Sequence, residues 1–188
     1  MKALDWVRGR RPAAPPDPST LKVRRVLIAS EGRPITTAVV DLAAKVAGGG
    51  DGERKASVIV FSTARIYGTS LGLPTPGLLP TRPEWEVQRT LVEKAVRTLK
   101  KRGFRAEARV VATRNPTKHI LRTAKGRFCD VIVMAADPYR HPLRAEFMWS
   151  QEAYRVERNS PVPVYLVPQG ATAMTRQLSR KTREAGIA

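Results

Sequence analysis

Cysteine and histidine are scarce in this sequence, and it has no long apolar run. Cys129 is the only cysteine, so the chain cannot form an internal disulfide, which predicts a reducing, cytoplasmic location. The two histidines, His119 and His141, stand without a cysteine cluster and supply no ligand set for a metal site. No apolar run approaches the roughly 18 residues of a membrane span. We therefore expect neither a metal nor membrane attachment.

Sequence patterns that carry catalysis are also missing. The chain has no G-x-S-x-G nucleophile motif, no Walker lysine motif and no paired carboxylates. His119 falls within a predicted helix between Lys118 and Ile120, where an ordinary helix residue is the simpler interpretation. The sequence therefore predicts a protein that is not an enzyme.

Acidic residues are outnumbered two to one. The chain has 16 Asp plus Glu against 34 Lys plus Arg, which gives a formal net charge of +18. Such an excess favours an anionic partner such as RNA, DNA or an acidic lipid surface. The alternative is a solvated surface in an arginine-rich proteome. A nucleic-acid or ribosome contact would use the basic tails and the clusters Lys22 to Arg25 and Lys100 to Arg105.

Apolar runs of strand length alternate with segments of helical spacing along the middle of the chain. The strand-like runs cover residues 23–30, 56–63, 105–111, 131–135 and 162–167. This alternation predicts an α/β fold, a doubly wound, Rossmann-like sheet of five parallel strands in the order 3-2-1-4-5, with helices on both faces. We expect residues 22–168 to form this domain. Residues 1–21 form a basic, proline-rich N-terminal tail, and residues 169–188 a basic C-terminal tail.

The loop after the fourth predicted strand lacks glycine. In a doubly wound sheet, ligands bind beyond the carboxyl ends of the strands, at the point where the strand order reverses. This rule places residues 30–32 opposite residues 135–137. A loop at this position commonly receives phosphate on glycine backbone, but no glycine occurs between Gly126 and Gly170.

Three segments taken together resemble the universal stress protein family. VRRVLIASEGRP is similar to its first strand, NPTKHILRTAKGRFCDVIVMAAD to its third helix and fourth strand, and NSPVPVYLVP to its closing strand. The likeness covers roughly residues 22–168. It implies a non-enzymatic regulatory, stress-response binding protein that acts through dimers and a protein partner, which the sequence does not identify.

The resemblance also implies where a nucleotide would bind. ATP-binding members carry G-x2-G-x9-G-[ST] after the fourth strand and an acid after the first. Here Ala135 and Pro138 stand at the first two glycines, and Trp149 stands at the third, with one extra residue in the loop. Ser150 stands at the serine and Glu31 at the acid. Proline removes an N–H donor, and the Trp149 indole fills space that phosphate needs. We therefore expect a degenerate ATP-binding motif and no cofactor.

A rebuilt anion site is the alternative. Basic side chains can hold a phosphate where backbone no longer does, and Ser150, as the N-cap of the next helix, marks a helix end that favours anions. ATP or another adenine nucleotide would then contact Glu31, Ala135, Arg140, His141, Arg144 and Ser150.

The closing strand is the expected dimer contact. The resemblance implies a homodimer paired through the last strand, here Pro163 to Val167. Apolar residues alternate along it between flanking prolines, which is compatible with an exposed sheet edge that pairs with its twin.

Overall fold

The computed structural model describes residues 15–18, 21–49, 56–65, 79–137 and 151–169. Its strands are β1 (Arg25–Ser30), β2 (Ser57–Arg65), β3 (Arg105–Thr113), β4 (Val131–Ala136) and β5 (Val164–Pro168). Its helices are α1 (Thr37–Gly48), α2 (Arg82–Lys101), α3 (Pro116–Gly126) and α4 (Glu152–Asn159). Strands and helices alternate as the sequence predicts.

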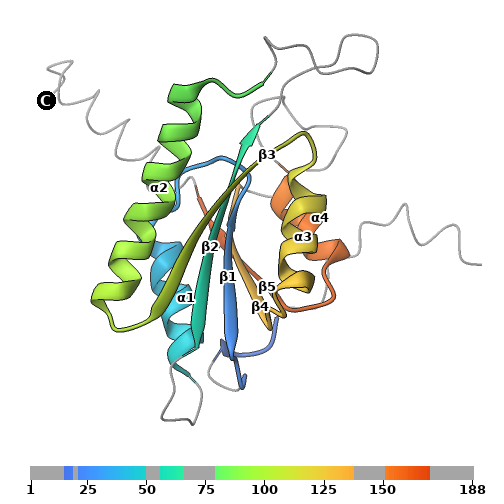
Figure 1. Cartoon of the computed structure of the whole chain (residues 1–188). Helices are drawn as coiled ribbons and strands as arrows, with labels where there is room; N and C mark the ends of the chain where they lie inside the picture. Colours follow the sequence, from blue (N-terminus) through green and yellow to red (C-terminus); the bar gives the residue numbers. More distant parts are fainter. Residues whose placement is uncertain (1–14, 19–20, 50–55, 66–78, 138–150, 170–188) are drawn as a thin grey trace, which may run out of the picture.

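The five strands form one parallel sheet in the order β3-β2-β1-β4-β5 (Figure 1). The predicted fold class and strand order are confirmed. β2 and β3 each run two residues further than expected, because their pairing continues to Arg65 opposite Thr113. Since β1 lies between β2 and β4, the strand order reverses beside β1, and the carboxyl ends of β1 and β4 lie next to each other.

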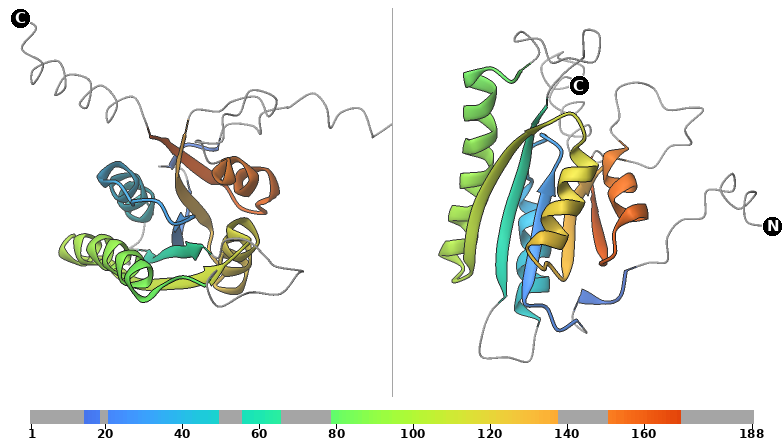
Figure 2. Two further views of the ribbon diagram at one scale, coloured as in Figure 1. Left: turned by 90° about the horizontal axis from the view of Figure 1, so that it is seen from above. Right: turned by 45° about the vertical axis from the view of Figure 1, so that its right-hand side comes forward.

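Each face of the sheet is covered by two helices, with α1 and α2 on one face and α3 and α4 on the other (Figure 2). Alternate residues of a strand point to opposite faces, so β1 contributes to both cores. Val26 and Ile28 pack with α1 and α2, whereas Leu27 and Ala29 pack with α3 and α4. Within the described ranges, no helix is both long and apolar enough to cross a bilayer.

Local sequence signals set the starts of α2 and α3. At α2 the Thr81 backbone N–H donates to Oε2 of Glu84 (2.6 Å), which satisfies a donor at the helix start. At α3 the Asn115 side chain accepts from the backbone N–H of Lys118 (2.9 Å), and Pro116 occupies the first helical position. α3 therefore begins at Pro116.

α3 ends in a Schellman motif with phenylalanine at the position that usually holds glycine. The N–H of Cys129 donates to the carbonyl of Ala124 (2.9 Å), and that of Phe128 to the carbonyl of Lys125 (3.1 Å). Phe128 has φ +51° and its side chain is 83% exposed. Left-handed backbone costs a non-glycine residue about 1 kcal/mol, and this ring recovers little of it by burial.

Phe128→Gly is expected to raise the free energy of unfolding by about 1 kcal/mol. Glycine removes the backbone strain, and little apolar burial is lost because the ring is exposed. Urea denaturation of the two proteins measures the difference. Phe128→Ala, which keeps a Cβ in the left-handed region, serves as the control and should not be stabilised. A destabilised glycine variant would contradict this account.

The Cys129 thiol is buried at 4% exposure behind the end of α3. Burial raises the pKa of this thiol from 9.0 to about 11, against the smaller opposing effect of the nearby Arg25 guanidinium. The thiolate is the reactive form. A pKa higher by about two units reduces the thiolate population about 100-fold at pH 8.

Disulfide reagents are therefore expected to label Cys129 at least about 100-fold more slowly in the native protein than in urea. The folded pKa exceeds the unfolded value, so the neutral thiol contributes fully to stability below about pH 9 and loses that contribution as pH rises toward 11. The stability difference between the wild type and Cys129→Ala should shrink over that window. Rapid native labelling at pH 8 would be inconsistent with a buried thiol.

Candidate functional site

Two buried carboxylates meet where β1 and β4 end. Glu31 directly follows β1 and is 2% exposed, and Asp137 directly follows β4 and is 7% exposed. The structure thus brings together the two strand ends that the sequence predicts to be adjacent. Two carboxylates buried side by side repel each other and lose hydration, so a positive partner between them is stabilising.

Arg33 supplies that positive charge. Its Nη2 lies 2.5 Å and its Nε 2.7 Å from Oε1 of Glu31, and its Nη1 lies 2.5 Å from Oδ2 of Asp137. The Arg33 side chain is 24% exposed. One guanidinium therefore joins the end of β1 to the end of β4; we call this arrangement the Arg33 bridge. Sequence reasoning missed Arg33, because nothing in the segment Glu31-Gly32-Arg33 indicates that the side chain reaches across to β4.

A tight turn at Gly32 directs Arg33 into the bridge. Gly32 has φ +105°, and a Cβ at this position would lie 2.9 Å from the carbonyl oxygen of Thr63. The Ser30 hydroxyl accepts from the N–H of Gly32 (3.2 Å) and donates to the carbonyl of Arg33 (2.6 Å). This turn is therefore a position that requires glycine, both for its backbone angle and for its close approach to β2.

α2 holds the same turn from the other side. The Gln88 side chain donates from Nε2 to the carbonyl of Gly32 (2.9 Å) and accepts from the Ser62 hydroxyl (2.7 Å). The sequence does not predict these roles of Gln88 and Ser62, because a single amide on an amphipathic helix does not indicate which residues it will contact. Ser62 is fully buried, so these two bonds fix the turn relative to β2.

The start of α4 lies beside the end of β4. The Tyr154 hydroxyl donates to the backbone carbonyl of Asp137 (2.6 Å). The prediction that Ser150 is the N-cap of this helix is wrong, because α4 begins at Glu152 with Gln151 as its N-cap. The Glu152 carboxylate lies in the first turn, where it interacts favourably with the positive helix end, and it accepts from the Thr117 hydroxyl. A protein carboxylate therefore already lies at this helix end.

The other predicted contact residues divide into two groups. Ala135 is 8% exposed and belongs to β4, where it packs against the core beneath α1. It therefore lies at the same end of the sheet as Glu31. Pro138, Arg140, His141, Arg144, Trp149 and Ser150 lie outside the described residues. Among the residues that the structure describes, no group of three or more acidic, histidine or cysteine side chains is placed to hold a metal ion.

A comparison with models of protein families identifies the family of this chain. The model of the universal stress protein family matches residues 22–168. The chain belongs to the universal stress protein family. Members take part in stress responses, and some bind nucleotides. No curated protein matches the chain significantly.

Solved structures of universal stress proteins share its fold. A protein from Archaeoglobus fulgidus is 16% identical, with a TM-score of 0.55 over 76% of this chain and 91% of its own. A universal stress protein from Archaeoglobus fulgidus, solved in complex with dAMP, is 16% identical, with a TM-score of 0.54 over 76% of this chain and 95% of its own. A family member from Burkholderia pseudomallei is 19% identical, with a TM-score of 0.55 over 77% of this chain and 96% of its own. At these identities the likeness establishes the fold alone.

Proposed function

We propose that this universal stress protein is a non-enzymatic regulatory protein that acts through homodimers and a protein partner, and that the Arg33 bridge closes its family's nucleotide site. One observation supports the proposed closure of the nucleotide site. Arg33 holds Glu31, the residue at the position of the family's ribose-contacting acid, and Asp137, which begins the loop equivalent to the phosphate loop.

The energetic cost of breaking the Arg33 bridge favours a closed nucleotide site. A ribose hydroxyl would compete for a Glu31 oxygen that already accepts from Arg33 at 2.5 and 2.7 Å. Separating Arg33 from Glu31 would leave a carboxylate of 2% exposure without this partner, a loss of several kcal/mol. The substitutions at Ala135, Pro138 and Trp149 act in the same direction, because each stands at a glycine of the family's ATP motif.

Calorimetry with ATP, ADP, AMP and cyclic AMP tests the closed site. We expect no heat of binding to the full chain at millimolar nucleotide. Titration of dAMP into the Archaeoglobus fulgidus protein, which was solved with that nucleotide, is the positive control. Saturable binding at micromolar concentration would overturn closure and would favour a site rebuilt by Arg140, His141 and Arg144.

The edge of β5 supplies the proposed dimer contact. In a parallel pair, alternate residues direct their backbone groups at the neighbouring strand. Pro163 and Gln169 belong to the set that bonds β4, through the pairs Ile132 N–H to Pro163 carbonyl (3.0 Å) and Gln169 N–H to Ala136 carbonyl (2.7 Å). Val164 and Leu166 alternate with that set and direct their backbone groups outward. A second copy of β5 would bond there.

Analytical ultracentrifugation of Leu166→Pro tests the edge. The wild type is expected to be a dimer at micromolar concentration, and the proline variant a monomer, because it loses an outward N–H donor. Leu166→Ala removes the same side chain but keeps the N–H, and it should remain a dimer. Circular dichroism confirms that each variant is folded. A monomeric wild type, or a dimeric proline variant, would contradict pairing through β5.

A further inference from the structure

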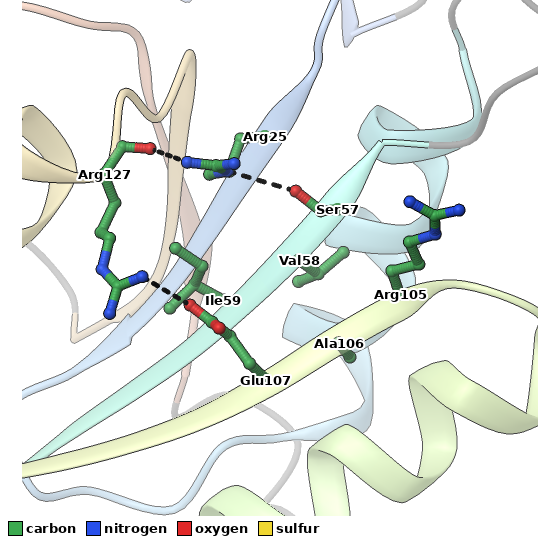
Figure 3. Close-up of a pocket in the computed structure, with 8 residues that line it drawn as sticks. All are labelled: Arg25, Ser57, Val58, Ile59, Arg105, Ala106, Glu107 and Arg127. Carbon is green, nitrogen blue, oxygen red and sulfur yellow. Dashed lines mark hydrogen bonds and ion pairs between the residues drawn. The ribbon is translucent and has the colours of Figure 1, made fainter.

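A hollow of about 310 Å³ lies at the opposite end of the sheet from the Arg33 bridge, at the amino ends of β1, β2 and β3 (Figure 3). Three arginines line it, one from β1, one from β3 and one directly after α3, together with Ser57 and the buried Ile59. We call this hollow the amino-end hollow; its arginines are Arg25, Arg105 and Arg127.

The strand register assembles the hollow from distant parts of the chain. Arg25 lies opposite Ser57, and Ser57 lies opposite Arg105, so the three occupy one row across β1, β2 and β3. Residues in one such row share a face of the sheet. The clusters Lys22 to Arg25 and Lys100 to Arg105, far apart in sequence, each contribute an arginine here. The turn after α3 adds Arg127.

The arginines of the hollow keep most of their positive charge available. Arg25 donates to the Ser57 hydroxyl (3.3 Å) and to the backbone carbonyl of Arg127, and neither acceptor is charged. Arg127 and Glu107 are 3.7 Å apart and about half exposed, at 46% and 55%, so water screens that pair. Arg105 is exposed and forms no ion pair with another described residue. Three guanidinium groups and one carboxylate thus line the hollow.

The basic surface continues along α3. Helix α3 contains no Asp or Glu, and Lys118, Arg122 and Lys125 are exposed at spacings of four and three residues. Residues at these spacings share one side of a helix. The stripe extends toward the hollow, because Arg127 follows directly on the end of α3. Asp130, the next acid along the chain, is held by the backbone N–H groups of Arg24 and Arg25 (2.7 and 2.9 Å).

Phe128 places an exposed aromatic residue directly after Arg127 in the chain. It is 83% exposed, at a left-handed position where glycine is usual. The backbone strain at Phe128 is not offset by burial of its ring, which points to a role for this side chain in binding rather than in folding. Positive charge together with an exposed aromatic ring is the combination on which single-stranded nucleic acids bind, with phosphates on the cations and a base stacked on the ring.

We propose that the amino-end hollow, the basic side of α3 and Phe128 form a binding surface for single-stranded nucleic acid. The guanidinium groups of Arg25, Arg105 and Arg127 hold phosphates, and the Phe128 ring stacks on a base. A paired base in a duplex is not available for such stacking, so single strands are preferred. This proposal goes beyond the regulatory function above and does not depend on the Arg33 bridge, which lies at the other end of the sheet.

Fluorescence anisotropy with a labelled 12-nucleotide single-stranded RNA tests the surface on the full chain. Phe128→Ala is expected to weaken binding about tenfold through the loss of stacking. The double variant Arg105→Ala/Arg127→Ala is expected to weaken it at least tenfold. It should also reduce the slope of log affinity against log salt by about 1.4, or 0.7 for each lost phosphate contact.

The matched control removes two positive charges from the other side of the sheet. Arg89 and Arg97 are exposed on α2, and the double variant Arg89→Ala/Arg97→Ala should bind within about twofold of the wild type. An equal loss of affinity in this control would overturn the proposal, because net charge alone would then explain binding. Equal binding of a duplex of the same length would also overturn it.

Phe128→Gly separates the two roles of this position. The glycine variant is expected to unfold at a higher temperature than the wild type and yet to bind the RNA about tenfold more weakly. Unchanged affinity in this variant would sink the proposed stacking role. Nucleotide calorimetry at the Arg33 bridge reads a different site, so the failure of either proposal is recognised without reference to the other.

Discussion

Arg33→Met is expected to lower the free energy of unfolding by about 3 kcal/mol. Methionine keeps most of the side-chain volume but removes the guanidinium between Glu31 and Asp137, whose carboxylates are 2% and 7% exposed. The two negative charges would then remain close together with little access to water, which is the costly way to break a buried ion pair. Urea denaturation followed by circular dichroism measures the change.

Two further variants test the cause of that loss. Arg102 forms an ion pair of similar length with Asp41 (2.6 Å), but its side chain is 38% exposed and that of Asp41 53%. Arg102→Met should therefore change stability by less than about 1 kcal/mol. Adding Glu31→Gln and Asp137→Asn to Arg33→Met removes the buried charges and should restore part of the loss. If Arg33→Met were no worse than Arg102→Met, the bridge would have no structural role.

Gly32→Ala is also expected to cost about 3 kcal/mol. Gly32 has φ +105°, a conformation that alanine rarely adopts, and the new Cβ would lie 2.9 Å from the backbone oxygen of Thr63. Backbone cannot move aside as a flexible side chain would. The turn would open, and Gly32 would lose its bond from Gln88 (2.9 Å). Thermal and urea denaturation both report the effect.

Gly126→Ala is the matched control. Gly126 is the last residue of α3, and a Cβ added there would meet nothing within 4 Å. Alanine favours helix over glycine by up to about 1 kcal/mol, so this variant should be as stable as the wild type or more so. A Gly32→Ala protein with native stability would show that the turn tolerates a side chain despite its close approach to β2.

Regular local patterns explain why the fold was predictable. The buried strands β1 and β4 are continuous apolar runs in the sequence, as expected of strands covered on both faces, and Asn115 with Pro116 marks the start of α3 without any tertiary information. The strand order follows from alternating strands and helices with right-handed crossovers. From that order alone, the ends of β1 and β4 can be placed side by side.

The chemistry at those ends was less predictable. The positions of Glu31 and Ala135 follow from the strand ends, but the Arg33 bridge depends on a side chain reaching across from β1 to β4. The sequence predicts Ser150 as the N-cap of α4 because serine is a frequent N-cap, but Gln151 occupies that position. The left-handed backbone of Phe128 cannot be predicted from the sequence, because the left-handed residue after a helix is usually glycine.

The order in which helices occur along the chain has a consequence for synthesis on the ribosome. Both helices that cover one face of the sheet, α1 and α2, precede both helices that cover the other, α3 and α4. While the chain emerges, the side chains of Ile59 and Phe61 of β2 therefore stay exposed to solvent until Ile120 of α3 has been synthesised. At about 5–20 residues per second this exposure lasts several seconds. During that interval the part of the sheet already synthesised exposes an apolar face to which a chaperone can bind.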